Sequence, residues 1–241
     1  MKKNLEIKGL RKSYGVKTVV SDISFSVDQG QVVGLIGPNG AGKTTAFYMT
    51  MGLIKPDKGT ILFQGKDVSK LPIHKRAKLG MGYLSQEPSV FQKLSVEKNL
   101  LCILETLPLS KKERLFSLEK LLDELSLKAL RKERASNLSG GERRRLEITR
   151  SLITNPSILL LDEPFANIDP IAIDDLKKLI CHLKEKKISI LITDHNIREV
   201  FSIVDKLYLM INGKIIFEGT KEELMQDQKA KQLYLGANFT L

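Results

Sequence analysis

The feature that most constrains this fold is a glycine-rich loop between an apolar run at 31–36 and a helix predicted over 45–53. The loop fits the pattern of a phosphate-binding loop, in which spaced glycines precede a lysine and a threonine. The glycines let successive backbone N–H groups point at phosphate oxygens, and the positive end of the helix adds to them. We expect Lys43 to reach the terminal phosphates and Thr44 to hold Mg²⁺. The residues predicted to bind nucleotide here are Gly37, Pro38, Asn39, Gly40, Ala41, Gly42, Lys43, Thr44 and Thr45.

A second apolar run, at 158–161, ends in the two carboxylates Asp162 and Glu163. Such a run suits a central strand of a parallel sheet, buried on both faces. Ligands bind beyond the carboxyl ends of such strands, so we expect Asp162 to hold Mg²⁺ and Glu163 to act as general base on an attacking water. The alternative is that the two acids only cap a following helix.

The segment Leu138–Glu142, which reads LSGGE, lies between the phosphate loop and the acidic strand end. It resembles the signature motif of the ATP-binding cassette (ABC) ATPases. Four single residues also support the resemblance. Each alone is more often a solvated or structural side chain, but their order along the chain matches that of the family. They are Tyr14, Gln86, Asp169 and His195.

The resemblance implies a role for each of these positions. Gln86 would sense Mg²⁺ and the attacking water, His195 would bond the γ-phosphate of ATP, and Tyr14 would stack on adenine. Two subunits would pair head to tail as a homodimer, with Asp169 near the partner. The signature of one subunit would then contact ATP held by the other, through Ser139, Gly140 and Gly141.

The chain is predicted to be a single ABC nucleotide-binding domain over 1–241, of the α/β class. We expect a P-loop NTPase core, an N-terminal antiparallel β layer at 5–63, and an inserted α-helical subdomain at about 95–151. Within the helical part, five leucines are predicted to share one helical face. An Asn-Gly pair at 212–213 predicts a hairpin over 206–217. The leucines are Leu115, Leu118, Leu121, Leu122 and Leu125.

The composition favours a cytosolic globular protein. The N-terminus lacks the apolar core of a signal peptide, and no run approaches the ~20 apolar residues of a membrane span. The two cysteines show no metal-binding spacing. The net charge of +11 is dispersed over stretches of mixed sign, which predict solvated helical faces rather than a nucleic-acid-binding surface. These stretches are 111–114, 131–134 and 142–145.

Longer segments are similar to the ATPase subunits of bacterial lipopolysaccharide export systems. They are 37–49, 89–95, 139–145, 161–166, 192–196 and the tail, with Tyr234, Gly236, Phe239 and Leu241. This resemblance implies a homodimer bound beneath two integral membrane permease subunits, peripheral on the cytoplasmic face of the inner membrane. A groove near Phe91 would receive each permease, although Phe91 could instead pack inside the helical subdomain. Departures from the pattern are Ser85, Gln92 and Asn167.

Other interpretations share the ATP motifs. The chain could serve another transporter, such as a branched-chain amino-acid importer, and only the tail and the Phe91 segment argue against this. A soluble ABC ATPase acting on nucleic acid or ribosomes usually carries two cassettes or a long coiled coil. A phosphotransferase would not require the signature motif or His195.

Overall fold

A computed structural model describes residues 2–166, 168–230 and 233–234 of the chain. The strands in these residues form two sheets. The first is antiparallel, in the order β2-β1-β4-β5. Its strands are β1 Lys3–Tyr14, β2 Lys17–Asp28, β4 Lys58–Phe63 and β5 Lys66–Asp67.

The second sheet has the order β10-β9-β3-β8-β7-β6 and is parallel except at its β10 edge. The strands β3, β7 and β8 are buried along their whole length, as expected for a parallel sheet covered on both faces. The six strands are β3 Val32–Ile36, β6 Met81–Leu84, β7 Ile158–Asp162, β8 Ser189–Thr193, β9 Lys206–Ile211 and β10 Lys214–Gly219.

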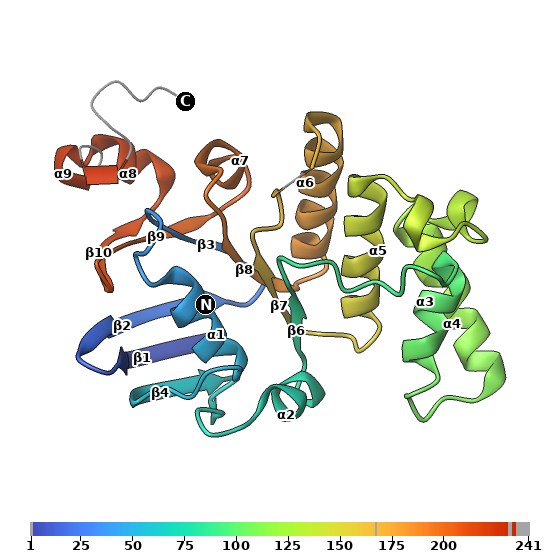
Figure 1. The fold of residues 1–241 in the computed structure, drawn as a ribbon, viewed down its shortest axis with the longest axis horizontal. Coiled ribbons are helices and arrows are strands. Elements are labelled where there is room, and N and C mark those ends of the chain that lie inside the picture. Colours follow the sequence, from blue (N-terminus) through green and yellow to red (C-terminus); the bar gives the residue numbers. More distant parts are fainter. Residues whose placement is uncertain (1, 167, 231–232, 235–241) are drawn as a thin grey trace.

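The helices surround this sheet or extend beyond it. Figure 1 shows α3 and α4 on the far side of α5, away from both sheets, and this is the region predicted to be helical. None of the helices in the described ranges has the length and apolar character needed to span a bilayer. The helices are α1 Lys43–Met51, α2 Ile73–Lys78, α3 Val96–Leu104, α4 Lys111–Glu124, α5 Gly140–Leu152, α6 Pro170–Glu185, α7 Ile197–Phe201, α8 Lys221–Gln226 and α9 Gln228–Ala230.

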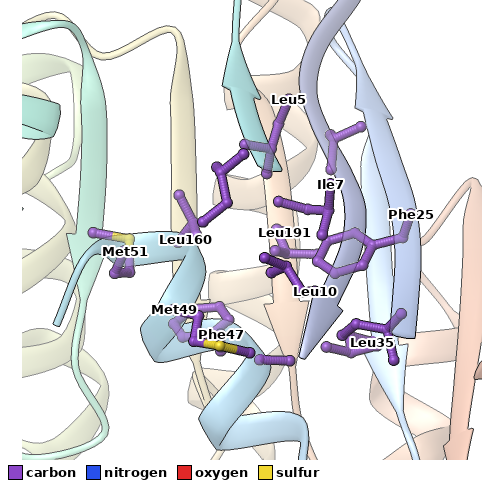
Figure 2. Close-up of a cluster of buried hydrophobic side chains, with 14 of the residues drawn as sticks. Leu5, Ile7, Leu10, Phe25, Leu35, Phe47, Met49, Met51, Leu160 and Leu191 are labelled. Carbon is purple, nitrogen blue, oxygen red and sulfur yellow. The ribbon is translucent and has the colours of Figure 1, made fainter. Parts of the chain in front are cut away.

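Alternating strand residues divide the interior into separate cores. In β3, Val33 and Leu35 face the core shared with the antiparallel sheet and α1, whereas Val32 and Ile36 face the core beneath α6 and α7. Figure 2 shows the first of these, in which Phe47 of α1 lies among side chains from both sheets. A third core lies between α3, α4 and α5. The phosphate loop therefore begins at a fully buried strand and ends at a helix whose apolar side chains pack into the first core.

The C-terminal end of α1 is held by a buried arginine that the sequence did not reveal. Arg76 is only 1% exposed, and its guanidinium donates hydrogen bonds to the carbonyls of Met49 (2.9 Å) and Thr50 (2.6 Å). Burial lowers the pKa of Arg76 to about 10. A cation at the negative end of a helix is favourable, so Arg76 helps to fix the helix that carries Lys43.

The predicted hairpin and the predicted leucine face can be compared with the structure. The 206–217 hairpin is confirmed, since Asn212 and Gly213 have the positive φ angles, 48° and 77°, of a type I′ turn. The predicted leucine face was one turn too long, because Leu115 is 46% exposed, whereas Leu118, Leu122 and Leu125 are buried and Leu121 is partly buried. Leu115 lies outside the core that α4 shares with α3 and α5.

The predicted charged helical faces are wrong in two places. Residues 131–134 form a turn rather than a helix, and Arg131 bonds two acids from other elements, Glu97 at 2.5 Å and Glu119 at 2.6 Å. Within 142–145, Arg144 is buried instead of solvated. A mixed-charge run cannot show which of its members meets acceptors contributed by distant segments.

Candidate functional site

The glycine-rich loop connects the end of β3 to the first residue of α1. Gly42, the N-cap of α1, has φ 98°, and a Cβ atom built there would lie 2.6 Å from the carbonyl oxygen of Val19. At Gly37 it would lie 2.1 Å from the carbonyl oxygen of Met210. Both positions therefore require glycine, because neighbouring backbone leaves no room for a side chain. The loop borders a cavity of about 460 Å³, lined by Lys17, Thr18, Val19, residues 39–45, Glu163, Asn212 and Gly213.

Lys43 is held inside this loop. Its ammonium group donates hydrogen bonds to the carbonyl oxygens of Gly37 (2.7 Å) and Pro38 (3.0 Å). Burial lowers the pKa of Lys43, while the carboxylates of Glu163 and Asp162 act in the opposite direction. The loop thus carries a cation and the positive end of α1 at one place, which suits an anionic phosphate chain.

Asp162 lies at the carboxyl end of β7 and is 2% exposed. Its Oδ1 accepts a hydrogen bond from the Thr193 hydroxyl at 2.6 Å, whereas its Oδ2 is buried without a partner among the described residues. Burial raises the pKa of Asp162. A buried carboxylate oxygen of this kind is a suitable ligand for Mg²⁺, which binds to oxygen and would compensate the desolvated charge.

Glu163 has a strained backbone, with φ 45° in the left-handed region. Its N–H donates to the Thr193 carbonyl at 2.7 Å, which directs the chain away from the sheet. The Gln86 amide donates to Glu163 Oε2 at 2.8 Å, and His195 Nδ1 lies 3.5 Å from the same oxygen. The structure therefore brings together the three residues predicted to be catalytic, although they come from different elements. Strain of this kind costs roughly 1–3 kcal/mol and is concentrated at functional sites.

Asp194 is a buried acid that the sequence analysis missed. It has no exposed surface, and it accepts hydrogen bonds from the N–H groups of Phe165 (3.0 Å) and Asn196 (2.8 Å). Burial raises the pKa of Asp194. The carboxylate connects the turn after Glu163 to the segment that carries His195. Its position directly after an apolar strand, like that of Asp162, was the available signal.

The signature residues lie at the start of α5. Ser139 is the N-cap, and its hydroxyl and the Glu142 carboxylate form a reciprocal capping box. Ser139 and Gly140 are exposed, and neither they nor Gly141 belong to the described lining of the phosphate-loop cavity. At Gly141 a Cβ atom would lie 2.3 Å from the Cβ of Ala172, so α5 and α6 pack closely there.

Tyr14, the predicted adenine contact, is 51% exposed at the end of β1. It is not among the residues described as lining the cavity, but its strand partner Lys17 is. The predicted partner contact Asp169 is the N-cap of α6, where its side chain accepts from the Ala172 N–H at 3.0 Å. Asn167 lies outside the described residues.

A line of charged residues on α5 holds the segment that follows β6. Arg144 donates to the Ser85 carbonyl (2.8 Å), to Glu147 Oε2 (3.0 Å) and to the Asp162 carbonyl (3.2 Å). Glu147 Oε1 accepts from the Ser89 N–H at 2.8 Å. One turn later, the Arg150 guanidinium lies 4.8 Å from the centre of an exposed aromatic ring, that of Phe91.

The sequence model of the ABC transporter family matches residues 20–166. The chain belongs to the ABC transporter family. It is therefore an ATP-binding, ATP-hydrolysing subunit, as predicted. The predicted fold class is also confirmed, because solved cassettes superimpose on nearly the whole chain. An ABC transporter cassette in its ADP conformation gives a TM-score of 0.87 at 33% identity, covering 98% of this chain and 100% of its own. A nucleotide-free cassette gives 0.85 at 32% identity, covering 96% and 98%.

Curated relatives are similar over their full length. The lipopolysaccharide export system ATP-binding protein LptB of Acidithiobacillus ferridurans is 50% identical over 241 residues, which is 100% of both chains. The protein of the same name from Haemophilus influenzae is 47% identical, and that from Escherichia coli K12 is 46% identical. Each of these two alignments covers 98% of this chain and 99% of the relative.

Proposed function

We propose that this chain is the subunit that powers lipopolysaccharide export by hydrolysing ATP. The observation that supports this best is the full-length identity of 46–50% to three proteins with that printed role. The phosphate loop and the acidic strand end are common to ABC ATPases, so they do not distinguish one transporter from another. The internal segments that carry the closer resemblance are all described, whereas Gly236, Phe239 and Leu241 of the tail lie outside the described residues.

In this proposal the phosphate loop and Lys43 bind the phosphate chain of ATP, and Tyr14 stacks on the base. Glu163 accepts a proton from the attacking water. Gln86 orients this carboxylate through its 2.8 Å hydrogen bond, and His195, whose Nδ1 lies 3.5 Å from the same carboxylate oxygen, donates to the γ-phosphate. The left-handed backbone at Glu163 fixes the base before ATP arrives, which lowers the cost of organising the site during the reaction.

Mg²⁺ is the second group that the site fits. We assign it to Asp162, through the unpartnered Oδ2, together with the Thr44 hydroxyl and, as a contact that senses the ion, Gln86. When bound, Mg²⁺ neutralises charge on the phosphates. Thr193 keeps Asp162 oriented through its hydroxyl, and the Arg144 guanidinium, which donates to the Asp162 carbonyl, holds the strand end in place.

We further propose that two copies pair head to tail as a homodimer, so that Ser139, Gly140 and Gly141 of one copy contact ATP bound to the other. The Ser139 N–H is bonded to Glu142 in the capping box, so the donors offered to a ligand are the Ser139 hydroxyl and the first-turn N–H groups of Gly140 and Gly141, which have no intrahelical acceptor. The arrangement makes hydrolysis depend on dimer formation, because neither copy alone would hold a complete site.

The Phe91 surface is proposed to bind the two integral membrane permease subunits. Phe91 is 49% exposed, which agrees with an interface rather than with core packing. Its backbone is fixed by the buried Asn99, and its ring is covered on one side by Arg150. A rigidly held, exposed aromatic residue is a typical interface anchor. Docking there would place the subunit on the cytoplasmic face of the inner membrane.

Purification from the membranes of the source cell tests this function. A tagged chain should bring two hydrophobic membrane proteins with it, and ATP hydrolysis by the purified complex should increase when lipopolysaccharide is added. The Phe91→Ala variant should lose the membrane proteins and keep its basal ATPase activity. Recovery of an amino-acid permease pair, with hydrolysis stimulated by an amino acid and its binding protein, would instead support the importer alternative.

A further inference from the structure

Arg144 occupies a position that joins three separate ATP-site segments. It lies on α5, five residues after Ser139, and is 7% exposed. One guanidinium nitrogen reaches the Ser85 carbonyl, next to Gln86, and the other reaches the Asp162 carbonyl, next to Glu163. Its hydrogen bonds therefore end beside two of the residues assigned to catalysis.

We propose that Arg144 is a positioning residue that couples the two ATP sites of the dimer. This inference rests on the head-to-tail pairing in the proposed function. The helix α5 begins with Ser139, which contacts the ATP of the partner, and one and a half turns later Arg144 holds the backbone beside the chain's own Glu163. At a rise of 1.5 Å per residue the two points are about 7.5 Å apart on one rigid helix. A shift of the signature therefore moves the support of the base.

The chemistry of the side chain suits this connection. The guanidinium is planar and has two separate nitrogen groups, so it can hold two carbonyls in a fixed relation. Glu147 balances its charge at 3.0 Å, and both side chains are almost fully buried. A buried ion pair often adds little net stability compared with apolar residues of similar size. The location of this pair between two ATP motifs therefore points to a role in positioning the backbone beside Gln86 and Glu163.

The Arg144→Lys variant tests the coupling, with Arg145→Lys as the matched control. Lysine retains the charge but presents a single point donor, which cannot hold both carbonyls. Arg145 pairs with Asp175 on the protein surface at 3.3 Å, and a lysine can preserve that pair. Hydrolysis rates are measured over a range of ATP concentrations, and binding of a fluorescent ATP analogue is measured separately.

We expect the wild-type and Arg145→Lys proteins to respond sigmoidally to ATP, with a Hill coefficient greater than unity. Arg144→Lys should give a coefficient near unity and a maximal rate lower by up to about 100-fold, the cost of displacing a catalytic group by about 1 Å. Its affinity for the ATP analogue should stay within about twofold of wild type, because the phosphate loop is unchanged. A general loss of structure would weaken binding as well.

If Arg144→Lys does not fold, the double variant Arg144→Met with Glu147→Leu removes the pair without leaving a buried charge, and the same loss of sigmoidal response is expected. A variant that keeps the wild-type Hill coefficient would overturn the proposal. So would a hyperbolic wild-type response under conditions in which Glu163→Gln forms an ATP-dependent dimer. Failure of that dimer to form would instead contradict the head-to-tail pairing itself.

Discussion

The buried amide of Asn99 gives the most quantitative prediction. Asn99 lies on α3 with no exposed surface. Its Oδ1 accepts from the Phe91 N–H at 2.8 Å, and its Nδ2 donates to the carbonyls of Phe91 (3.0 Å) and Ser95 (3.1 Å). Substitution with alanine removes these three bonds and a longer one to the Leu94 carbonyl at 3.4 Å. The turn that presents Phe91 then loses its side-chain attachment to α3.

The cost can be estimated from the one group left without a partner, the Phe91 N–H, because the carbonyls of Phe91, Leu94 and Ser95 still accept from the N–H groups of Leu94, Ala135 and Asn99. A buried N–H without a partner costs about 1–3 kcal/mol, so Asn99→Ala should lower the free energy of unfolding by about 1–3 kcal/mol. For a chain of this size each 1 kcal/mol lowers Tm by roughly 2–4 °C. Phe91→Ala removes a half-exposed ring and its contact with Arg150, at a cost of about 1 kcal/mol.

Thermal and urea unfolding, followed by circular dichroism, would compare the variants. Asn137→Ala is the matched control, because Asn137 lies in the same subdomain but is exposed. We expect Asn99→Ala to lower Tm by about 2–12 °C, Phe91→Ala by about 2–4 °C, and the control by almost nothing. If Phe91→Ala cost the ~3–5 kcal/mol typical of a core phenylalanine, Phe91 would be a packing residue and the interface proposal would fail.

Two further predictions concern the assigned ATP contacts. Mixing Lys43→Ala with Ser139→Asp chains should restore part of the activity that both parents lack, because one composite site remains intact. Aspartate at position 139 can still cap the helix, but its negative charge repels phosphate. Ser139→Asn is the uncharged control and should stay active. If a verified mixed dimer recovers no activity, the proposal of shared ATP sites is contradicted. Burial raises the pKa of Asp162, so this carboxyl keeps its proton to a higher pH in the folded protein than in the unfolded chain. Ionising it therefore lowers the stability of the folded protein as pH rises from the unfolded pKa to the folded pKa. The stabilisation that Mg²⁺ and ATP give should therefore increase as pH rises, and calorimetry at a series of pH values would measure it. If the Asp162→Asn variant showed the same increase, Asp162 would not be the metal ligand.

Short-range patterns explain which parts of the site could be predicted from the sequence. The phosphate loop, the acidic end of β7 and the Asn212–Gly213 turn each depend on neighbours within about ten residues. Gln86 and His195 were found only through the family resemblance, since nothing local shows that both approach Glu163.

The missed residues depend on distant acceptors. Arg144 appeared to be one member of a solvated charged run, because its bonds to Ser85 and Asp162 span 59 and 18 residues. Arg76 likewise bonds carbonyls 26 and 27 residues away. A burial pattern derived from periodicity assigns such charges to the surface, and only the tertiary structure supplies the carbonyls that satisfy them.

The most direct test of the whole account is the Glu163→Gln variant. Glutamine has almost the same shape and can still accept the hydrogen bond from Gln86, but it cannot take a proton from water. We predict that ATP hydrolysis is abolished while ATP binding is retained, and that ATP converts the variant to a dimer visible by size-exclusion chromatography. Near-normal turnover by this variant would contradict the role of Glu163 as the general base.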